Sequence, residues 1–431
     1  MRISPNRPIF IDLFAGCGGL SLGLMESGWQ GLFAVEKSPM AFETLKFNLI
    51  GHKDKYSFEW PAWLPIQAFD IHDILTTYTQ NLRNLQGIDL IAGGPPCQGF
   101  SMAGKRKVDD ARNYLFEQYL AFVDLVKPKM ILVENVRTFA TPFTKTERGA
   151  NGKEIENGFD ANEELKTKLG KLGYKVFVKY PIMAKDYGVP QLRPRYILIA
   201  IKNDLLKGDT QIDPFKILCT SREEFLRQRG LPTESEVTLY QAISDLERKH
   251  GEVTCVEEAM KTFMQGRYGE AESTYQQLMR KRRNGMRIKT GQVVDSHRFP
   301  NHKESTIKRF QLIVSKSRRG IQLRADEIEA YGLKKHRIAP LAPEQACHTL
   351  TSLPDDLIHY SELRIPTVRE YARIQSFPDW FEFKSKYTSG GDRRKVEVPR
   401  YTQVANAVPP LLASVLGETL RQVLDNTNNT D

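Results

Sequence analysis

Short apolar runs alternate with amphipathic stretches through the first 200 residues of the chain. This rhythm predicts a parallel sheet wrapped by helices. Helices are expected to begin near Gly18, to span Pro39–Leu49, and to span Tyr114–Val126 before Lys127-Pro128. The fold class indicated is α/β, with a doubly wound, mostly parallel sheet. Six strands are expected, at Ile9–Phe14, Leu32–Val35, Ile88–Ala92, Met130–Val133, Lys175–Tyr180 and Tyr196–Ile201.

Two segments of this first half break the alternation. Gly93–Asn113 is rich in Gly, Pro and charge, and Thr141–Asp160 is rich in Gly, Asn and Lys. We interpret both as long loops, which in compact domains are often functional. Near the end of the chain, Pro409–Leu424 is apolar at helical spacing and predicts a closing helix that packs back on the first domain.

The chain has 431 residues, which is too long for one ordinary core. The α/β rhythm fades after about Asn203, so we expect two domains. Residues 1–204 and 396–431 would form a catalytic and cofactor-binding domain, and residues 205–395 a smaller target-recognition domain.

Composition and charge indicate a folded protein that attracts polyanions. Hydrophobic residues make up 40% and charged residues 26% of the chain, and the formal net charge is +10. A nucleic acid is the partner that such a charge suits best, although a solvated basic face is the alternative. The basic side chains gather from Arg280 onward, interspersed with Phe299, Phe310 and Tyr331: Lys281-Arg282-Arg283, Arg298, Lys303, Lys308-Arg309, Lys316, Arg318-Arg319 and Lys334-Lys335.

The five cysteines are scattered, without a Cys-x-x-Cys pair or histidines at zinc spacing. We therefore expect neither a disulfide framework nor a metal site. No signal peptide or membrane-spanning stretch is apparent, which indicates a reducing cytoplasm in which a lone thiol stays free to react.

The segment Asp12–Leu20 follows a predicted strand and opens a helix, so its glycines let the backbone approach a ligand closely. A tight structural turn is the alternative. The dinucleotide pattern G-x-G-x-x-G is broken, because Ser21 follows Gly16 and Gly18 at the third position. Glu36, at the end of the next strand, is placed where such folds bind ribose hydroxyls. Phe14 and Asp70 are candidates to bracket an adenine.

Three further groups follow predicted strands. Cys97 lies in Gly93–Ser101, held between prolines and a polar loop, and a buried inert thiol is the alternative. Glu134 begins Glu134-Asn135-Val136 at a neighbouring strand end, so the two side chains are expected to converge on one planar substrate. Arg193 and Arg195 alternate toward one side, where two guanidiniums could meet a carbonyl and phosphates.

With these blocks, the sequence resembles the cytosine-5 DNA methyltransferases, most closely the bacterial enzymes of restriction-modification systems. The resemblance covers nearly the whole chain outside the basic middle region. Two departures are visible: Ala405 stands where the family usually has Gly, and Lys37 stands where some members place an aromatic. Six blocks occur in family order: Asp12–Gly19, Pro96-Cys97-Gln98, Glu134-Asn135-Val136, Gln191–Arg195, Arg369–Pro378 and Gln403–Pro409.

The resemblance implies a Rossmann-like fold that binds S-adenosyl-L-methionine and releases S-adenosyl-L-homocysteine. It implies Cys97 as covalent nucleophile, Glu134 as the acid, and Arg193 and Arg195 as base-binding groups. The cofactor pocket would be lined by Phe14, Ala15, Gly16, Gly18, Gly19, Glu36, Asp70, Ile71, Leu115, Asn406 and Val408. The substrate DNA would contact Pro95, Pro96, Gln98, Ser101, Lys105 and Arg106.

The implied reaction needs the target cytosine to leave the duplex, because its carbon 6 cannot be reached inside the stack. We expect a monomer that acts on double-stranded DNA in the cytoplasm of a bacterial or archaeal cell, on the nucleoid. Two rivals stay open: a tRNA cytosine-5 methyltransferase, and a catalytically inactive DNA-binding relative. The recognition sequence does not follow from these residues.

Overall fold

The computed structural model describes residues 7–95, 113–136, 143–148, 154–159, 161–206, 212–255, 262–333, 337–389, 393 and 396–428. For 143–148 and 154–159 it describes the backbone alone. The basic pair Lys334-Lys335 lies outside the described residues.

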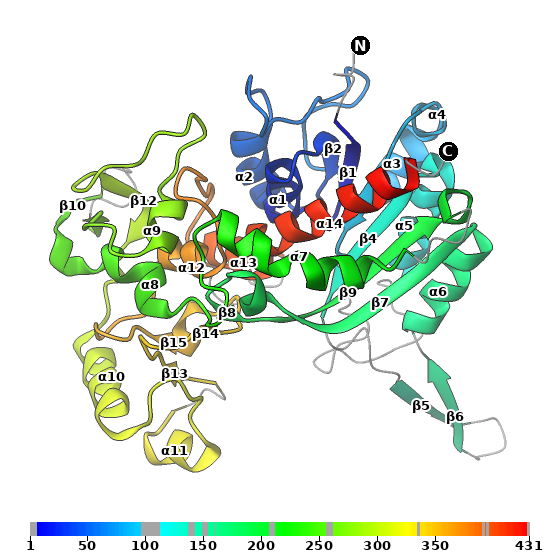
Figure 1. The fold of residues 1–431 in the computed structure, drawn as a ribbon. Helices are drawn as coiled ribbons and strands as arrows, with labels where there is room; N and C mark the ends of the chain where they lie inside the picture. Colours follow the sequence, from blue (N-terminus) through cyan, green and yellow to red (C-terminus); the bar gives the residue numbers. More distant parts are fainter. Residues whose placement is uncertain are drawn as a thin grey trace.

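A six-stranded sheet forms the centre of the molecule, in the order β2-β1-β3-β4-β9-β7 (Figure 1). The four strands β1 to β4 are parallel neighbours, whereas β9 is antiparallel to both β4 and β7. The six predicted strands are confirmed, with ends that differ by a few residues. Their bounds are β1 Ile9–Leu13, β2 Gln30–Val35, β3 Leu90–Gly93, β4 Met130–Asn135, β7 Tyr174–Met183 and β9 Pro194–Lys202.

The strands bury both of their faces, which explains their continuous apolar sequences. Phe10 of β1 belongs to one hydrophobic cluster, whereas its neighbours Ile9 and Ile11 belong to a second cluster. In β9, Ile199 and Leu198 divide in the same way. Successive side chains of a strand point to opposite sides, so the two clusters are the cores on the two faces of the sheet.

Helices cover both faces of this sheet. α1 (Gly19–Glu26), α2 (Pro39–Leu49), α7 (Pro214–Gln228) and α14 (Pro410–Asn428) contribute to the first core. α3 (Ile71–Thr77), α4 (Thr79–Arg83), α5 (Asn113–Val126) and α6 (Ala161–Lys171) contribute to the second. The closing helix is confirmed, because α14 packs along α1 and its Gly417 carbonyl accepts a hydrogen bond from Trp29 Nε1 at 2.9 Å.

The prediction of a loop at Thr141–Asp160 is wrong. β5 (Phe143–Arg148) and β6 (Glu154–Phe159) form an antiparallel hairpin that projects from the body of the molecule (Figure 1). Most of the segment is polar or Gly, with Phe143, Ile155 and Phe159 as scattered large apolar residues, so its composition resembles that of a loop. The other predicted loop, Gly93–Asn113, lies largely outside the described residues.

The region of the chain between the two halves of the sheet domain lies to one side of the central sheet in Figure 1. It contains an antiparallel sheet of β10 (Glu252–Thr254), β11 (Met264–Arg267) and β12 (Val293–Arg298). The helices α8 (Leu239–Ile243), α9 (Thr274–Met279) and α12 (Val368–Ile374) pack beside it. A small lobe follows, with α10 (Glu304–Lys316), α11 (Ala325–Ala330) and the strands β13 (Ala339–Pro340) and β15 (Leu357–Ile358).

The lobe has its own small core around Ile313 and Phe310, whereas the rest of this region shares the first core of the sheet domain. α7 packs against α14 and β7, so this helix lies with the central sheet although it follows residue 205. The two predicted parts of the chain are therefore joined by continuous apolar packing.

Candidate active site

A cavity of about 600 Å³ opens where the strands β1, β2, β3 and β4 end. Volumes of this size suit a cofactor or a small ligand. The predicted site residues that line it come from distant parts of the chain: Phe14, Ala15, Gly16, Glu36, Asp70, Ile71, Pro95, Leu115, Glu134, Arg193, Arg195, Asn406 and Val408.

The glycine-containing turn after β1 bends sharply toward this cavity. Phe14 and Gly16 have positive φ angles of 61° and 57°, and Gly18 caps α1 at 96°. A Cβ at Gly16 would meet nothing within 4 Å, so this position leaves open space beside the backbone. Such a turn brings main-chain groups close to a bound ligand.

Gly18 and Gly19 do not line the cavity, unlike the expectation for them. Instead they allow close packing: a Cβ at Gly18 would lie 2.8 Å from a methyl carbon of Leu49. A Cβ at Gly19 would overlap the carbonyl oxygen of Val408. These two glycines therefore set the position of α1 against its neighbours.

Glu36 is fixed at the end of β2 by two main-chain amides. Gly16 N donates to its Oε2 at 2.9 Å, and Ser38 N donates to its Oε1 at 2.7 Å. Burial raises the pKa of Glu36 above its ordinary value, and the amides of Ser38 and Gly16 act in the opposite direction. The carboxylate is thus held in one orientation at the cavity wall.

Asp70 caps α3 by accepting from His72 N at 2.9 Å and also pairs with Lys37 Nζ at 2.7 Å. Partial burial raises the pKa of Asp70, but the hydrogen bonds from Lys37 and His72 outweigh it, and the net pKa is lowered. Lys37 stands where some cytosine-5 methyltransferases are expected to have an aromatic residue. Its ion pair fixes the carboxylate of Asp70, which the sequence analysis expected beside an adenine.

Asp12 is a lining residue that the sequence reasoning did not single out as a site residue. It is fully buried, the Ser21 hydroxyl donates to its Oδ2, and its Oδ1 has no hydrogen-bond partner among the described residues. Burial raises its pKa to about 7. An unpartnered buried acceptor on a cavity wall fits a ligand that carries a cation or a donor.

Glu134 and Arg195 form a buried ion pair on adjacent antiparallel strands. Arg195 Nε lies 2.5 Å from Glu134 Oε1, and the two residues are 6% and 9% exposed. Arg195 Nη1 also donates to the Pro194 carbonyl at 2.8 Å. Glu134 is thus fixed by a charged donor from the neighbouring strand, whereas the predicted convergence of Glu134 with Cys97 involves a residue outside the described part of the chain.

Arg193 lines the same cavity and also holds the C-terminal segment. Its Nη2 donates to the Ala407 carbonyl at 3.0 Å, whereas its Nε has no partner among the described residues. Burial lowers the pKa of Arg193, Arg195 adds to this effect, and Glu134 opposes it. The free Nε leaves Arg193 one donor for a substrate atom.

The segment that leads to Cys97 is tied to the end of β4. Gly93 pairs with Val133, and Asn135 Nδ2 donates to the Pro95 carbonyl at 3.0 Å. The chain therefore leaves β3 beside Glu134. The predicted contacts Pro96, Cys97, Gln98, Ser101, Lys105 and Arg106 lie outside the described residues.

Further lining residues include two from a segment with no recognisable pattern. Thr349 and Leu350 follow the two-residue strand β14 (Cys347–His348), which pairs with β8 (Gln191–Leu192). Gln403 lines the cavity from α13 (Arg400–Asn406). Pairings of two residues leave no periodic signal, so only the fold reveals them.

Comparison with known proteins decides the family. Residues 9–422 match the family of C-5 cytosine-specific DNA methylases. The chain belongs to this family.

Two curated relatives of this cytosine-5 methylase align over most of both chains. One is the Type II methyltransferase M.DdeI of Desulfomicrobium norvegicum, 32% identical over 97% of this chain and 89% of the relative. Another is the Type II methyltransferase M.XorII of Xanthomonas oryzae pv. oryzae, 29% identical over 97% and 86%.

Solved structures share the fold of this methylase. A prophage-encoded E. coli protein assigned as a DNA modification methyltransferase superposes with a TM-score of 0.64 at 22% identity, covering 97% of this chain and 99% of that one. The Dnmt2 methyltransferase of S. pombe superposes with a TM-score of 0.52 at 16% identity, covering 98% and 100%. The Rossmann-like methyltransferase fold is therefore confirmed.

The departure of this methylase from its family at Ala405 is accommodated locally. Ala405 is buried within α13, and its backbone is not in the left-handed region. Alanine continues the helix to Asn406, where a glycine would weaken it.

No helix among the described residues is long and apolar enough to cross a membrane. Within the same part of the chain, no group of three or more His, Cys, Asp or Glu could hold a metal ion.

Proposed function

We propose that this methylase modifies carbon 5 of cytosine in a specific duplex DNA sequence, as the modification enzyme of a restriction-modification system. The carrying observation is the buried Glu134–Arg195 pair on a cavity that Gly16 and Glu36 also line. The same cavity is therefore lined by Glu134, which the Arg195 guanidinium fixes, and by a glycine-containing turn of the kind that binds nucleotides. The names of the aligned relatives support the choice of DNA and of a restriction-modification setting.

The residues present fit S-adenosylmethionine. Glu36 would accept from the ribose hydroxyls, and Phe14, Ile71, Leu115 and Val408 supply apolar wall around the adenine and its linkage. When bound, this cofactor supplies an electrophilic methyl group. The unpartnered Oδ1 of Asp12 adds an acceptor for the cationic part of the ligand.

Carbon 5 of cytosine is a poor nucleophile until a thiolate adds to carbon 6. In our proposal Cys97 forms this sulfur–carbon bond, and the electron pair displaced from the 5,6 double bond moves toward N3. Glu134 shares a proton with N3 and stabilises the charge that develops there. Arg195 orients Glu134 and, with Arg193, binds the O2 carbonyl of the base.

The enamine-like ring then takes the methyl group at carbon 5. Loss of the carbon-5 proton to a base and departure of the Cys97 thiolate from carbon 6 restore the double bond. Glu134 returns to its starting state. The net change at the base is that a carbon–methyl bond replaces the carbon–hydrogen bond at carbon 5, and S-adenosyl-L-homocysteine is the co-product.

The base must be turned out of the duplex to reach the cavity, at a cost of a few kcal/mol. We assign closure over the phosphates to the loop Gln98–Asn113, with Lys105-Arg106-Lys107, and assign sequence reading to the region from about Asn203 to Pro378. Basic side chains there would contact phosphates, and polar side chains would contact base edges.

Transfer of a labelled methyl group tests the proposal. Purified protein and labelled S-adenosylmethionine are incubated with a mixed-sequence duplex DNA library or with total tRNA. Label is expected in DNA, and it should be lost in Cys97→Ser. Label found in tRNA alone would show that tRNA and not DNA is the substrate. Transfer to neither nucleic acid would show that the protein is a catalytically inactive relative.

A further inference from the structure

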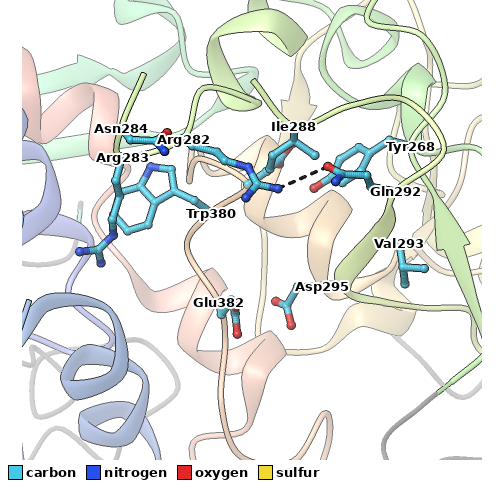
Figure 2. A pocket seen from close by; sticks show the side chains of 11 residues that line it. Tyr268, Arg282, Arg283, Asn284, Ile288, Gln292, Val293, Asp295, Trp380 and Glu382 are labelled. Atoms are coloured by element: carbon cyan, nitrogen blue, oxygen red, sulfur yellow. Dashed lines mark hydrogen bonds between the residues drawn. The ribbon is translucent and has the colours of Figure 1, made fainter. Parts of the chain in front are cut away.

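A second cavity, of about 630 Å³, lies in the recognition region between the segment 281–292 and residues 379–382 (Figure 2). It shares no lining residue with the active-site cavity. Its walls combine acceptors, donors and aromatic rings, which is the composition of a small-ligand site.

Two carboxylates lie on one side of this cavity, those of Asp295 and Glu382 (Figure 2). Asp295 Oδ2 accepts from Arg369 Nη2 at 2.9 Å, which leaves Oδ1 without a partner among the described residues. Glu382 Oε2 accepts from Lys384 Nζ at 2.6 Å, which leaves Oε1 without one in the same part of the chain. Each carboxylate is therefore held in place and offers one acceptor oxygen.

The backbone beneath Glu382 is also fixed. Its amide donates to Asn48 Oδ1 at 3.0 Å, and its carbonyl accepts from Asn48 Nδ2 at 2.7 Å. Preorganised acceptors of this kind lose little conformational entropy when a ligand binds.

Donors lie across the cavity from these acids. Arg282 Nη2 donates to Gln292 Oε1 at 3.4 Å, and within the described chain no carboxylate lies within 4.0 Å of Arg282. Gln292 Oε1 also accepts from the Lys289 amide at 3.0 Å, so its side-chain nitrogen is left as a donor. Lys281, Arg287 and Lys289, which are neighbours of the lining residues Arg282 and Ile288 in the sequence, are exposed and form no ion pair with any described residue.

The half-buried ring of Trp380 supplies flat apolar surface to the cavity, whereas Tyr268 is only 2% exposed. Trp380 and Tyr268 line it, and each ring is backed by a guanidinium: Arg283 lies 4.2 Å from the Trp380 ring and Arg280 lies 4.7 Å from the Tyr268 ring. Guanidinium stacking fixes the planes of both rings. A planar heteroaromatic ligand suits this surface better than a flexible chain does.

We propose that this cavity binds a guanine base joined to a phosphate. The N1–H and exocyclic amine of guanine would donate to Asp295 and Glu382, and its O6 and N7 would accept from Arg282 and Gln292. Lys281 and its basic neighbours would receive the phosphate. Adenine has no ring N–H beside its amine on this edge and carries no O6, so it would satisfy fewer of these groups.

Two sources carry this chemistry: a free guanine nucleotide, and an unpaired guanine in a DNA strand. Calorimetry on the full-length protein with GMP and AMP tests the first. GMP should bind at least about tenfold more tightly than AMP, and Glu382→Gln should weaken GMP at least about tenfold, as expected when a charged acceptor is lost. Arg282→Ala, on the opposite side of the cavity, should weaken the binding of GMP by a similar factor.

Glu304→Gln is the matched control, because Glu304 is likewise a carboxylate paired with a lysine, at 2.7 Å from Lys308, but lies in the separate lobe. It should leave the affinity for GMP unchanged. The second source is tested with a duplex that ends in a single-stranded guanine or adenine tail.

A preference for the guanine tail that disappears in Glu382→Gln assigns the site to DNA. If neither GMP nor the guanine tail shows binding that depends on Glu382, the proposal is wrong. Both readouts are binding measurements without methyl transfer, so their outcome is separate from that of the proposed function.

Discussion

The chemistry proposed for this methylase depends on how single charged groups are held. Glu134 is fixed by Arg195 at 2.5 Å, and Arg193 is fixed by the carbonyl of Ala407. Because these partners are internal to the protein, the acid is oriented before any base enters. Preorganisation of this kind lowers the reorganisation needed during the reaction.

Glu134→Gln should reduce kcat by about 10²–10⁴-fold, because an amide cannot share a proton with N3 as a carboxyl does. The affinity for the cofactor product should not change, since Glu36 and not Glu134 faces the ribose in our assignment. Single-turnover methylation measures the effect on the chemical step, and calorimetry with S-adenosylhomocysteine measures the effect on cofactor-product affinity. Unchanged kcat would show that Glu134 takes no part in the chemistry.

Asp12 makes stability depend on pH. Its pKa is raised to about 7 in the folded protein from an ordinary value of 3.8, so the folded state binds the extra proton between these values. Its contribution to stability is then complete below about pH 4 and is lost as the pH rises through about 7. Asp12→Asn should therefore raise Tm at pH 8 relative to the parent, with a benefit that shrinks toward pH 4. A benefit that is the same at pH 5 and pH 8 would contradict this.

At the scale of elements, close contacts and buried ion pairs set the position of helices around the site. α1 approaches the loop before α14 at Gly19, where a side chain would overlap the Val408 carbonyl and crowd Phe377. α12 is fixed by Arg373, which donates to Asp379 at 2.5 and 2.6 Å and to Asp245 at 3.2 and 3.1 Å.

Gly19→Ala should destabilise the protein by about 1–3 kcal/mol, because backbone must move to admit the methyl group. Gly170→Ala in α6 is the matched control, since nothing lies within 4 Å of a Cβ there. That substitution should be neutral or should stabilise by up to about 1 kcal/mol. Denaturant unfolding of both variants measures the difference, and equal effects would contradict the packing role of Gly19.

Arg373→Met should destabilise by about 3–5 kcal/mol, because it leaves Asp245 and Asp379 buried without their shared partner. Asp245 keeps Arg280 at 2.9 Å, whereas Asp379 keeps only Arg369 at 4.0 Å. Adding Asp379→Leu should recover part of the loss. A double variant no more stable than Arg373→Met alone would show that the uncompensated charge is not the cause.

The elements of the sheet domain could be predicted because burial gives them strong periodic signals. The six strands, the helix Pro39–Leu49 and the closing helix were predicted near their observed positions. The β5–β6 hairpin was not, because most residues of its strands are polar and the few large apolar ones give no clear alternation. At the site, strand ends revealed Glu134 and Arg195, whereas Thr349 and Leu350 reach the cavity through a two-residue pairing that leaves no pattern.

Across the whole molecule, a net charge of +10 favours DNA, but the basic residues are not equivalent. Arg283 is engaged within the protein: it pairs with Asp54 at 2.9 Å and stacks on Trp380. The ion pair with Asp54 links the recognition region to the sheet domain. Arg309, on α10, is exposed and forms no ion pair with a described residue. The aromatic residues among the basic ones, Phe299 and Phe310, are buried in cores.

Arg309→Ala should reduce the slope of log affinity against log salt by about 1, as expected for one lost phosphate contact. Arg283→Ala should leave that slope unchanged and should lower Tm instead. Fluorescence anisotropy on a duplex at several salt concentrations measures both. Equal slopes for the parent and Arg309→Ala would remove α10 from the DNA-binding surface.

The central claim is a covalent bond between Cys97 and carbon 6 of a cytosine, and trapping tests it most directly. Fluorine at carbon 5 blocks the final proton loss, so a duplex with 5-fluorocytosine at the methylated position should stay attached to the protein. With S-adenosylmethionine present, we expect a denaturant-resistant adduct, whose mass is that of protein plus methylated DNA, and its absence in Cys97→Ser. An adduct that persists in Cys97→Ser, or none on a duplex that the parent methylates, would contradict the account.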